Sequence, residues 1–179
     1  MDATAAWDDG PAEEMHVLGA EPIVPDFSGF YAQVRGPVAR ALAVTLGDAD
    51  LAADAADEAL ARAYASWAKV ARMANPSGWV YRVGLNWARS GLRRRNQWHP
   101  GLTAVVDPGP AAPVEPSLVA ALAALSVRQR SVVVCRYLLG YSDHETSVAL
   151  GLRPGTVRSS LQRGLRRLRD ELGHLREEQ

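Results

Sequence analysis

Arginine, glutamine and serine side chains recur at helical spacing near the C-terminal end of the sequence, and these residue types can read DNA. With an advance of 100° per residue, a helix starting near Pro154 carries Ser159, Gln162 and Arg163 on one face. Arginine can pair with guanine and glutamine with adenine, whereas serine more often contacts phosphate. The opposite face is apolar and can pack; it carries Val157, Leu161, Leu165, Leu168 and Leu172. The alternative is a surface amphipathic helix whose arginines are only solvated.

A second, shorter helix is predicted directly before that one. Ser142 followed by Glu145 matches a capping box, and Gly151 is typical of a helix end. Pro154 suits the first turn of the next helix, because its missing N–H would have no partner there. The pattern predicts a helix-turn-helix from Tyr141 to Leu172. Nine arginines lie between residues 127 and 169 against two acids, an excess expected of a phosphate-binding surface.

Charge is distributed unevenly along the chain, although its formal net charge is zero. Residues 1–26 contain seven acids and no Lys or Arg, whereas residues 82–95 contain five arginines and no acid. Because binding follows the local potential, a neutral average does not argue against nucleic acid.

Several function classes find no support in the residue pattern. The four histidines are scattered without ligand spacing, and Cys135 sits in an apolar run, so we expect no metal site and a reduced, buried thiol. No nucleophile-base pair, carboxylate dyad or phosphate loop suggests an enzyme, and no cofactor is expected. The N-terminus lacks a signal-peptide pattern and no apolar run approaches membrane-spanning length, which predicts a soluble, cytoplasmic protein without membrane contact.

Three helices are predicted in the N-terminal half. The first begins at Asp26, where an apolar periodicity of three and four starts, and ends at Gly47-Asp48. The second runs from about Asp50 to Trp67 and carries three acids outward, namely Asp54, Asp57 and Glu58.

The third helix follows a loop at residues 76–78 and runs from about Trp79 to Arg94, with Val80, Val83 and Trp87 as its apolar stripe. Its polar face carries Arg82, Asn86, Arg89 and Arg93. Solvation alone would explain that face, but no acidic partner accompanies these residues, which favours nucleic-acid contact.

A proline-rich segment separates this half from the next. Residues 96–116 contain five prolines and no strand pattern, and 21 extended residues could reach roughly 70 Å. A second helical unit follows, with helices from Leu118 to Leu125 and from Ser126 to Leu139 before the helix-turn-helix. The prediction is an all-α chain of two small helical domains: extension 1–25, first domain 26–95, linker 96–116 and second domain 117–179.

The order of these motifs resembles the extracytoplasmic-function sigma factors of bacterial RNA polymerase. The first domain resembles their minus-ten-binding domain in residues 27–31, 47–48, 53–59 and 75–83 with Asn86 and residues 93–95. The second resembles their minus-thirty-five-binding domain in residues 121–125, 128–130, 136–137 and 155–159 with Arg163 and residues 168–169. The resemblance covers about residues 26–172. The sequence departs from it in four places. Thr146 and Ser147 replace an apolar residue and alanine, and the pair Asp57-Glu58 replaces the commoner Gln-Glu. Ser160 replaces a frequent arginine, which predicts that one phosphate contact is missing.

The resemblance implies an initiation factor that binds core polymerase and two promoter elements. It assigns polymerase binding to Asp54, Asp57 and Glu58, and minus-ten DNA to Asn75, Arg82, Asn86, Arg89 and Arg93. It assigns minus-thirty-five DNA to Arg136, Arg158, Ser159, Gln162 and Arg163. An anti-sigma factor is a candidate further partner. The competing interpretation is a stand-alone helix-turn-helix regulator, which would leave the first domain without a role.

Overall fold

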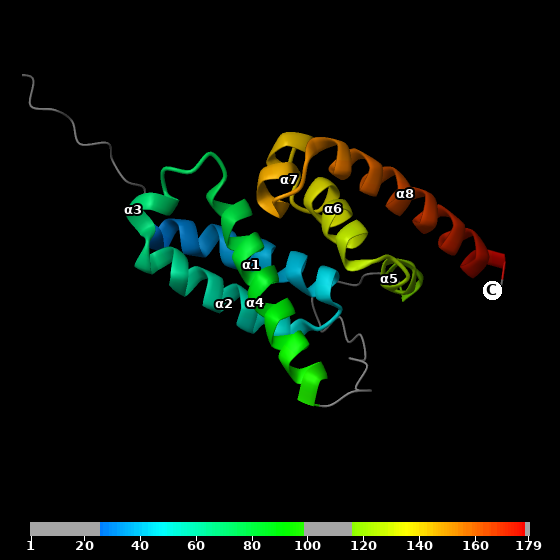
Figure 1. Ribbon diagram of the computed structural model, residues 1–179, viewed down its shortest axis with the longest axis horizontal. Coiled ribbons are helices and arrows are strands. Elements are labelled where there is room, and N and C mark those ends of the chain that lie inside the picture. Colours follow the sequence, from blue (N-terminus) through cyan, green and yellow to red (C-terminus); the bar gives the residue numbers. More distant parts are fainter. Residues whose placement is uncertain (1–25, 99–115, 178–179) are drawn as a thin grey trace, which may run out of the picture.

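The structure is a computed structural model that describes residues 26–98 and 116–177. These residues form eight helices. In chain order they are α1 (Phe27–Leu46), α2 (Ala49–Ala65), α3 (Trp67–Val70), α4 (Pro76–Trp98), α5 (Pro116–Ala123), α6 (Val127–Tyr137), α7 (Asp143–Leu150) and α8 (Pro154–Glu177). Figure 1 shows α1 to α4 on one side of the molecule and α5 to α8 on the other, with α6 and α7 against α1 and α4. We call these two groups the first and second blocks.

The turn between α1 and α2 forms as the sequence predicts. Gly47 ends α1 with a left-handed φ of 72°, a conformation that glycine adopts without steric cost. Asp48 then caps α2, its side chain accepting a hydrogen bond from the Leu51 amide at 2.9 Å. The helix predicted through Trp67 is shorter, because Ser66 leaves helical geometry with φ −124°. Trp67 begins α3 instead and packs edge-on against Phe27, with ring centroids 5.2 Å apart.

The predicted loop at residues 76–78 is wrong, because these residues are the first turn of α4. Asn75 caps the helix, its Oδ1 accepting a hydrogen bond from the Gly78 amide at 2.7 Å. Pro76 fits the first helical position, where its missing N–H costs no hydrogen bond. The helix also continues to Trp98, past the predicted end and three residues into the predicted linker.

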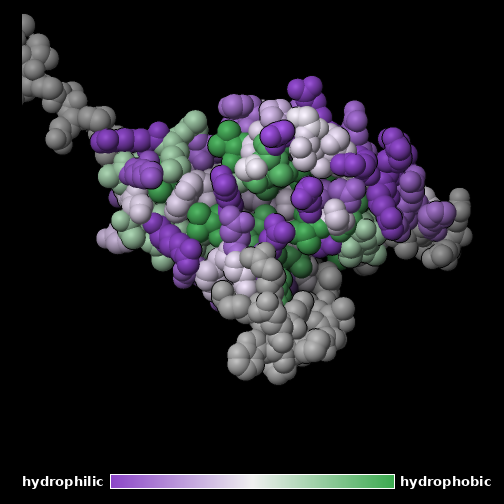
Figure 2. Space-filling view, in the orientation of Figure 1, coloured by the Kyte–Doolittle hydropathy of each residue, from purple (hydrophilic) through white to green (hydrophobic). Residues whose placement is uncertain are grey.

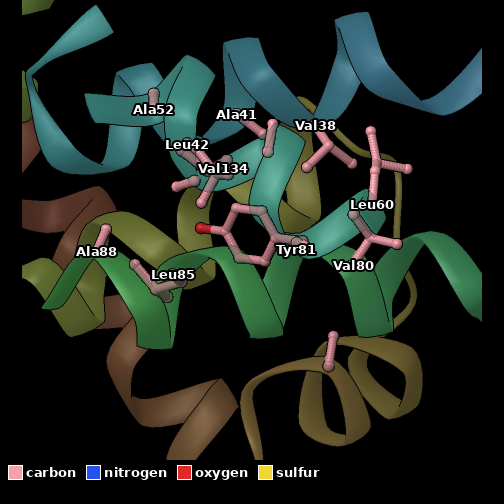
Figure 3. Close-up of a cluster of buried hydrophobic side chains, with 14 of the residues drawn as sticks. Val38, Ala41, Leu42, Ala52, Leu60, Val80, Tyr81, Leu85, Ala88 and Val134 are labelled. Carbon is pink, nitrogen blue, oxygen red and sulfur yellow. The ribbon is translucent and has the colours of Figure 1, made fainter. Parts of the chain in front are cut away.

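The main core lies between α1, α2 and α4. Tyr81 is fully buried at its centre (Figure 3). Its hydroxyl lies 2.8 Å from Thr45 Oγ1. Burial raises the pKa of Tyr81, so the phenol stays protonated. The predicted stripe of α4 was incomplete: Val80 is buried as expected, but Leu85 is buried too, whereas Val83 is only partly buried.

Helix α4 approaches α2 closely at Gly84. An added Cβ would lie 2.9 Å from the Ala55 carbonyl oxygen and 2.9 Å from Leu42 Cδ1. Only glycine leaves room for these two helices to cross at this distance.

Both α6 and α7 begin at capped residues, and the capping box of α7 is the one that the sequence predicts. Ser126 with Gln129 and Ser142 with Glu145 both form capping boxes, at the starts of α6 and α7. The hydrogen bonds from the Ser142 backbone and side chain hold the pKa of Glu145 below its usual range. Gly151 ends α7 with φ 63°. The apolar face of α8 forms a smaller core with α5 and α6, made of Ala121, Leu122, Leu125, Val133, Leu161, Leu165, Leu168 and Leu172.

The two blocks are joined by shared packing. Val134, Cys135, Tyr141 and Ala149 of the second block belong to the main core of the first. Cys135 is fully buried, as predicted, and burial raises the pKa of its thiol to about 12. Residues 1–25 and 99–115, which hold the predicted extension and most of the predicted linker, lie outside the described residues.

Candidate nucleic-acid interface

The outer face of α8 carries the residues expected to read DNA. Arg158, Gln162 and Arg163 are exposed, while Ser159 is half-buried and donates its hydroxyl to the Thr156 carbonyl at 3.2 Å. Hydrophilic side chains gather along α8 on the right of the molecule (Figure 2). Ser160 is turned inward and only 1% exposed, so the position where the resemblance expects a phosphate contact does not face outward here.

Arg136 is held inside the second block. Its guanidinium donates to the Tyr141 carbonyl and pairs with Asp143, with Nε 3.1 Å from Oδ1. The side chain therefore fixes the turn between α6 and α7, and a contact to DNA would have to share or replace these partners.

The polar face predicted for α4 opens onto a cleft between the blocks. Arg82, Asn86 and Arg89 line this cleft, of about 530 Å³, together with Arg163 of α8. Residues that we assigned to two different promoter elements thus face the same space. Arg93 lies further along α4, but its side chain is not among those described.

Asn75 lies beside a smaller cavity of about 310 Å³. Met73, Trp79 and the α7 residues Val148 and Ala149 form its walls. The Asn75 side chain is engaged at the start of α4, where its Oδ1 also accepts the Ser77 hydroxyl at 2.9 Å. Ser77 in turn contacts the Tyr141 hydroxyl at 2.9 Å, so this end of α4 is tied to the second block.

Two of the three acids expected to contact polymerase form ion pairs within the chain. Asp57 pairs with Arg35 of α1 through two bonds of 2.7 and 2.8 Å, and Glu58 pairs with Arg62 at 2.7 Å. The bond to Asp57 raises the pKa of Arg35. Asp54 is exposed, and no cation of the described residues pairs with it.

Arg130 connects the two blocks, a structural role that the sequence analysis did not assign to it. It is only 7% exposed and donates to three carbonyls: Thr45 of α1 at 3.0 Å, Ala123 at the end of α5 at 2.9 Å, and Leu125 just after α5 at 3.1 Å. Burial lowers its pKa. Its burial could have been inferred from the sequence, because Arg130 lies four residues before Val134 on a helix face that is otherwise apolar.

The described residues contain neither a membrane-spanning helix nor a cluster of metal ligands. No helix within 26–98 or 116–177 is long and apolar enough to cross a membrane. Over the same ranges, no group of three or more His, Cys, Asp or Glu side chains is placed to hold a metal ion.

The fold and the arginine-lined surfaces define an all-helical DNA-binding protein with a helix-turn-helix in its second block. Residues 117–168 match the family model for region 4 of sigma-70. The chain is 37% identical over 130 residues to an RNA polymerase sigma-E factor of Streptomyces antibioticus, covering 68% of this chain and 70% of the relative. It is 34% identical over 144 residues to the ECF RNA polymerase sigma factor SigM of Mycobacterium tuberculosis, covering 77% and 71%. The chain belongs to the extracytoplasmic-function family of RNA polymerase sigma factors.

A solved structure shares the fold. The sigma factor RpoE of Bartonella quintana, crystallised with the anti-sigma factor NepR, superposes with a TM-score of 0.70 at 25% identity, covering 83% of this chain and 97% of that one. As a sigma factor, the protein binds core RNA polymerase and promoter DNA and initiates transcription, which decides against the stand-alone regulator.

Proposed function

We propose that the residues of the two blocks divide promoter recognition between them. Arg158, Gln162 and Arg163 on the open face of α8 read base edges of the minus-thirty-five element, with Ser159 and Arg136 on its backbone. Arg82, Asn86, Arg89 and Arg93 of α4 hold the backbone of the minus-ten element. The observation that carries this proposal is the placement of Arg82, Asn86 and Arg89 on one face of α4.

The cavity beside Asn75 is proposed to receive one unstacked base of the minus-ten element. Reading a base on its pairing edge requires removing it from the stack, which costs a few kcal/mol and helps to melt the duplex. Asn75 suits this role because its amide is held by the start of α4 and is therefore positioned in advance.

Promoter binding also requires the blocks to move apart in this proposal. The wall of the Asn75 cavity is partly made by α7, and Arg89 and Arg163 face one cleft. Two DNA segments cannot be read at once from surfaces that face each other. The arrangement of Figure 1, with the two blocks in contact, is called closed here, and in this proposal it precedes the binding of polymerase and DNA.

A promoter library tests the division of roles. Arg163→Ala should cost about 1–3 kcal/mol and relax discrimination at one upstream base position, because it removes a base contact. Arg89→Ala should weaken binding to all sequences and lower the salt slope by about 1, because it removes a phosphate contact. The measurement is transcription by core polymerase from the library at several salt concentrations. Identical effects of both variants would contradict the division.

The polymerase contact is assigned to Asp54, Asp57 and Glu58 of α2, whose charge would speed and orient association. Asp54→Lys separates binding from folding, because Asp54 is exposed and has no ion-pair partner among the described side chains. Core polymerase affinity should fall, whereas the melting temperature should stay within about a degree or two. Asp57→Lys is the comparison, since it also places a lysine against Arg35. Unchanged affinity in Asp54→Lys would remove this residue from the contact.

Location and a further partner follow from the same proposal. The protein would act in the cytoplasm, where polymerase and promoter DNA are found. An anti-sigma factor is proposed as a regulator, supported by the likeness to a sigma factor that was crystallised with one. Co-purification of the tagged chain with such a protein tests this.

A further inference from the structure

The described lining of the cleft between the blocks carries positive charges and no negative ones. Four arginines line it, Arg82 and Arg89 from α4, Arg128 from α6 and Arg163 from α8, and no acidic residue is among its described lining. Within the described part of the chain, no carboxylate pairs with Arg89, Arg128 or Arg163. Closing the blocks therefore brings like charges from both of them toward one space, which opposes closure unless an anion is present.

The remaining lining is suited to phosphate oxygens. The side chains of Asn86 and Gln129 supply amide groups beside the guanidinium groups, whereas the Ser126 hydroxyl is engaged in the capping box of α6. The N-terminal turn of α6 also borders the cleft, and the positive end of a helix dipole adds to the same potential. The volume of about 530 Å³ falls in the range of sites that hold small organic ligands.

We propose that this cleft binds a small polyphosphate anion, of the size of a nucleoside polyphosphate, which bridges the two blocks and holds the chain closed. The anion would occupy Arg82 and Arg89, which hold DNA phosphates in the proposed function, and Arg163, which reads a base edge. It would thus inhibit promoter binding. That inhibitory part rests on the proposed function, whereas binding and closure do not.

Cys135 provides a measure of closure that does not involve DNA. Its thiol is fully buried in the core shared by the two blocks, so a thiol reagent reaches it only when the blocks separate or the chain unfolds. A ligand that binds only the closed chain lowers the fraction of open chain. The thiol reaction, which needs the open chain, slows by the same factor.

The experiment uses the full chain, tripolyphosphate as the probe, and 5,5′-dithiobis(2-nitrobenzoate) as the thiol reagent. At about ten times its dissociation constant, tripolyphosphate should slow the reaction of Cys135 about tenfold. Calorimetry gives the dissociation constant independently. Absence of binding, or binding without slower thiol reaction, would overturn the proposal.

Arg128→Gln is the test variant, because Arg128 is exposed, lines the cleft and has no assigned part in DNA or polymerase binding. Its affinity for tripolyphosphate should fall about tenfold, the loss expected for one charged hydrogen bond. Transcription without the anion should be unchanged. Arg72→Gln, an exposed arginine outside the cleft, should bind the anion as the unmodified chain does. Equal losses in both variants would indicate nonspecific attraction and contradict the proposal.

The same experiment distinguishes two other possible occupants of the cleft. If tripolyphosphate binds only after removal of residues 1–25, the acidic N-terminal segment fills the cleft, and the proposal is wrong. If a single-stranded oligodeoxynucleotide protects Cys135 and tripolyphosphate does not, the cleft is a nucleic-acid site alone, and the proposal is again wrong. Failure of the promoter-library experiment would instead contradict the proposed function and leave anion binding as measured.

Discussion

Arg130 is a buried cation that no carboxylate neutralises among the described residues, and its three carbonyl partners come from both blocks. Arg130→Ala should destabilise the chain by about 2–4 kcal/mol, because it leaves those carbonyls without their charged donor. Urea unfolding measures the loss. Arg128→Ala, two residues earlier and exposed, is the control and should change stability by no more than about 0.5 kcal/mol. Equal stability of the two variants would show that the Arg130 hydrogen bonds contribute little.

Helix α4 contains two glycines whose surroundings differ. Replacing each with alanine separates the effect of helix propensity on stability from the effect of packing. Gly84 has no room for a Cβ against Ala55 and Leu42, whereas a Cβ at Gly91 would meet nothing within 4 Å. Gly91→Ala should stabilise the protein by about 0.5–1 kcal/mol through better helix propensity. Gly84→Ala should instead destabilise it by about 1–3 kcal/mol, because α2 and α4 must separate. Thermal unfolding of both variants measures the difference, and stabilisation by both would contradict the close crossing.

Local signals predicted the elements better than the contacts between them. The capping box at Ser142 and the glycines that end α1 and α7 were predicted from a few neighbouring residues, and all of them form. The start of α4 was misplaced because Pro76 can open a helix as well as interrupt one. The burial of Arg130 against Thr45 could not be predicted, because the contact spans 85 residues and depends on how the blocks pack. The roles of the DNA-facing and polymerase-facing residues stay predictions.

At the scale of the whole molecule, the shared core makes the stability of each block depend on the other. Val134, Cys135, Tyr141 and Ala149 are buried against the first block, so a separated second block would expose them. We expect the fragments 1–98 and 116–179 each to melt at lower temperature than the intact chain and to recover stability when mixed. Circular dichroism of each fragment and of the mixture measures this. Fragments as stable as the intact chain would show that the shared core contributes nothing.

The contact between the blocks should also depend on temperature, because separating the blocks exposes both charged and apolar groups to water. Opening hydrates the Arg130 guanidinium and the apolar surface around Cys135. Hydration of a charged group becomes less favourable on warming, and apolar burial weakens on cooling. Both contributions favour contact between the blocks as temperature rises toward unfolding. A chilled chain should therefore open more readily than a warm one, and under the proposed function this would ease promoter access at low temperature.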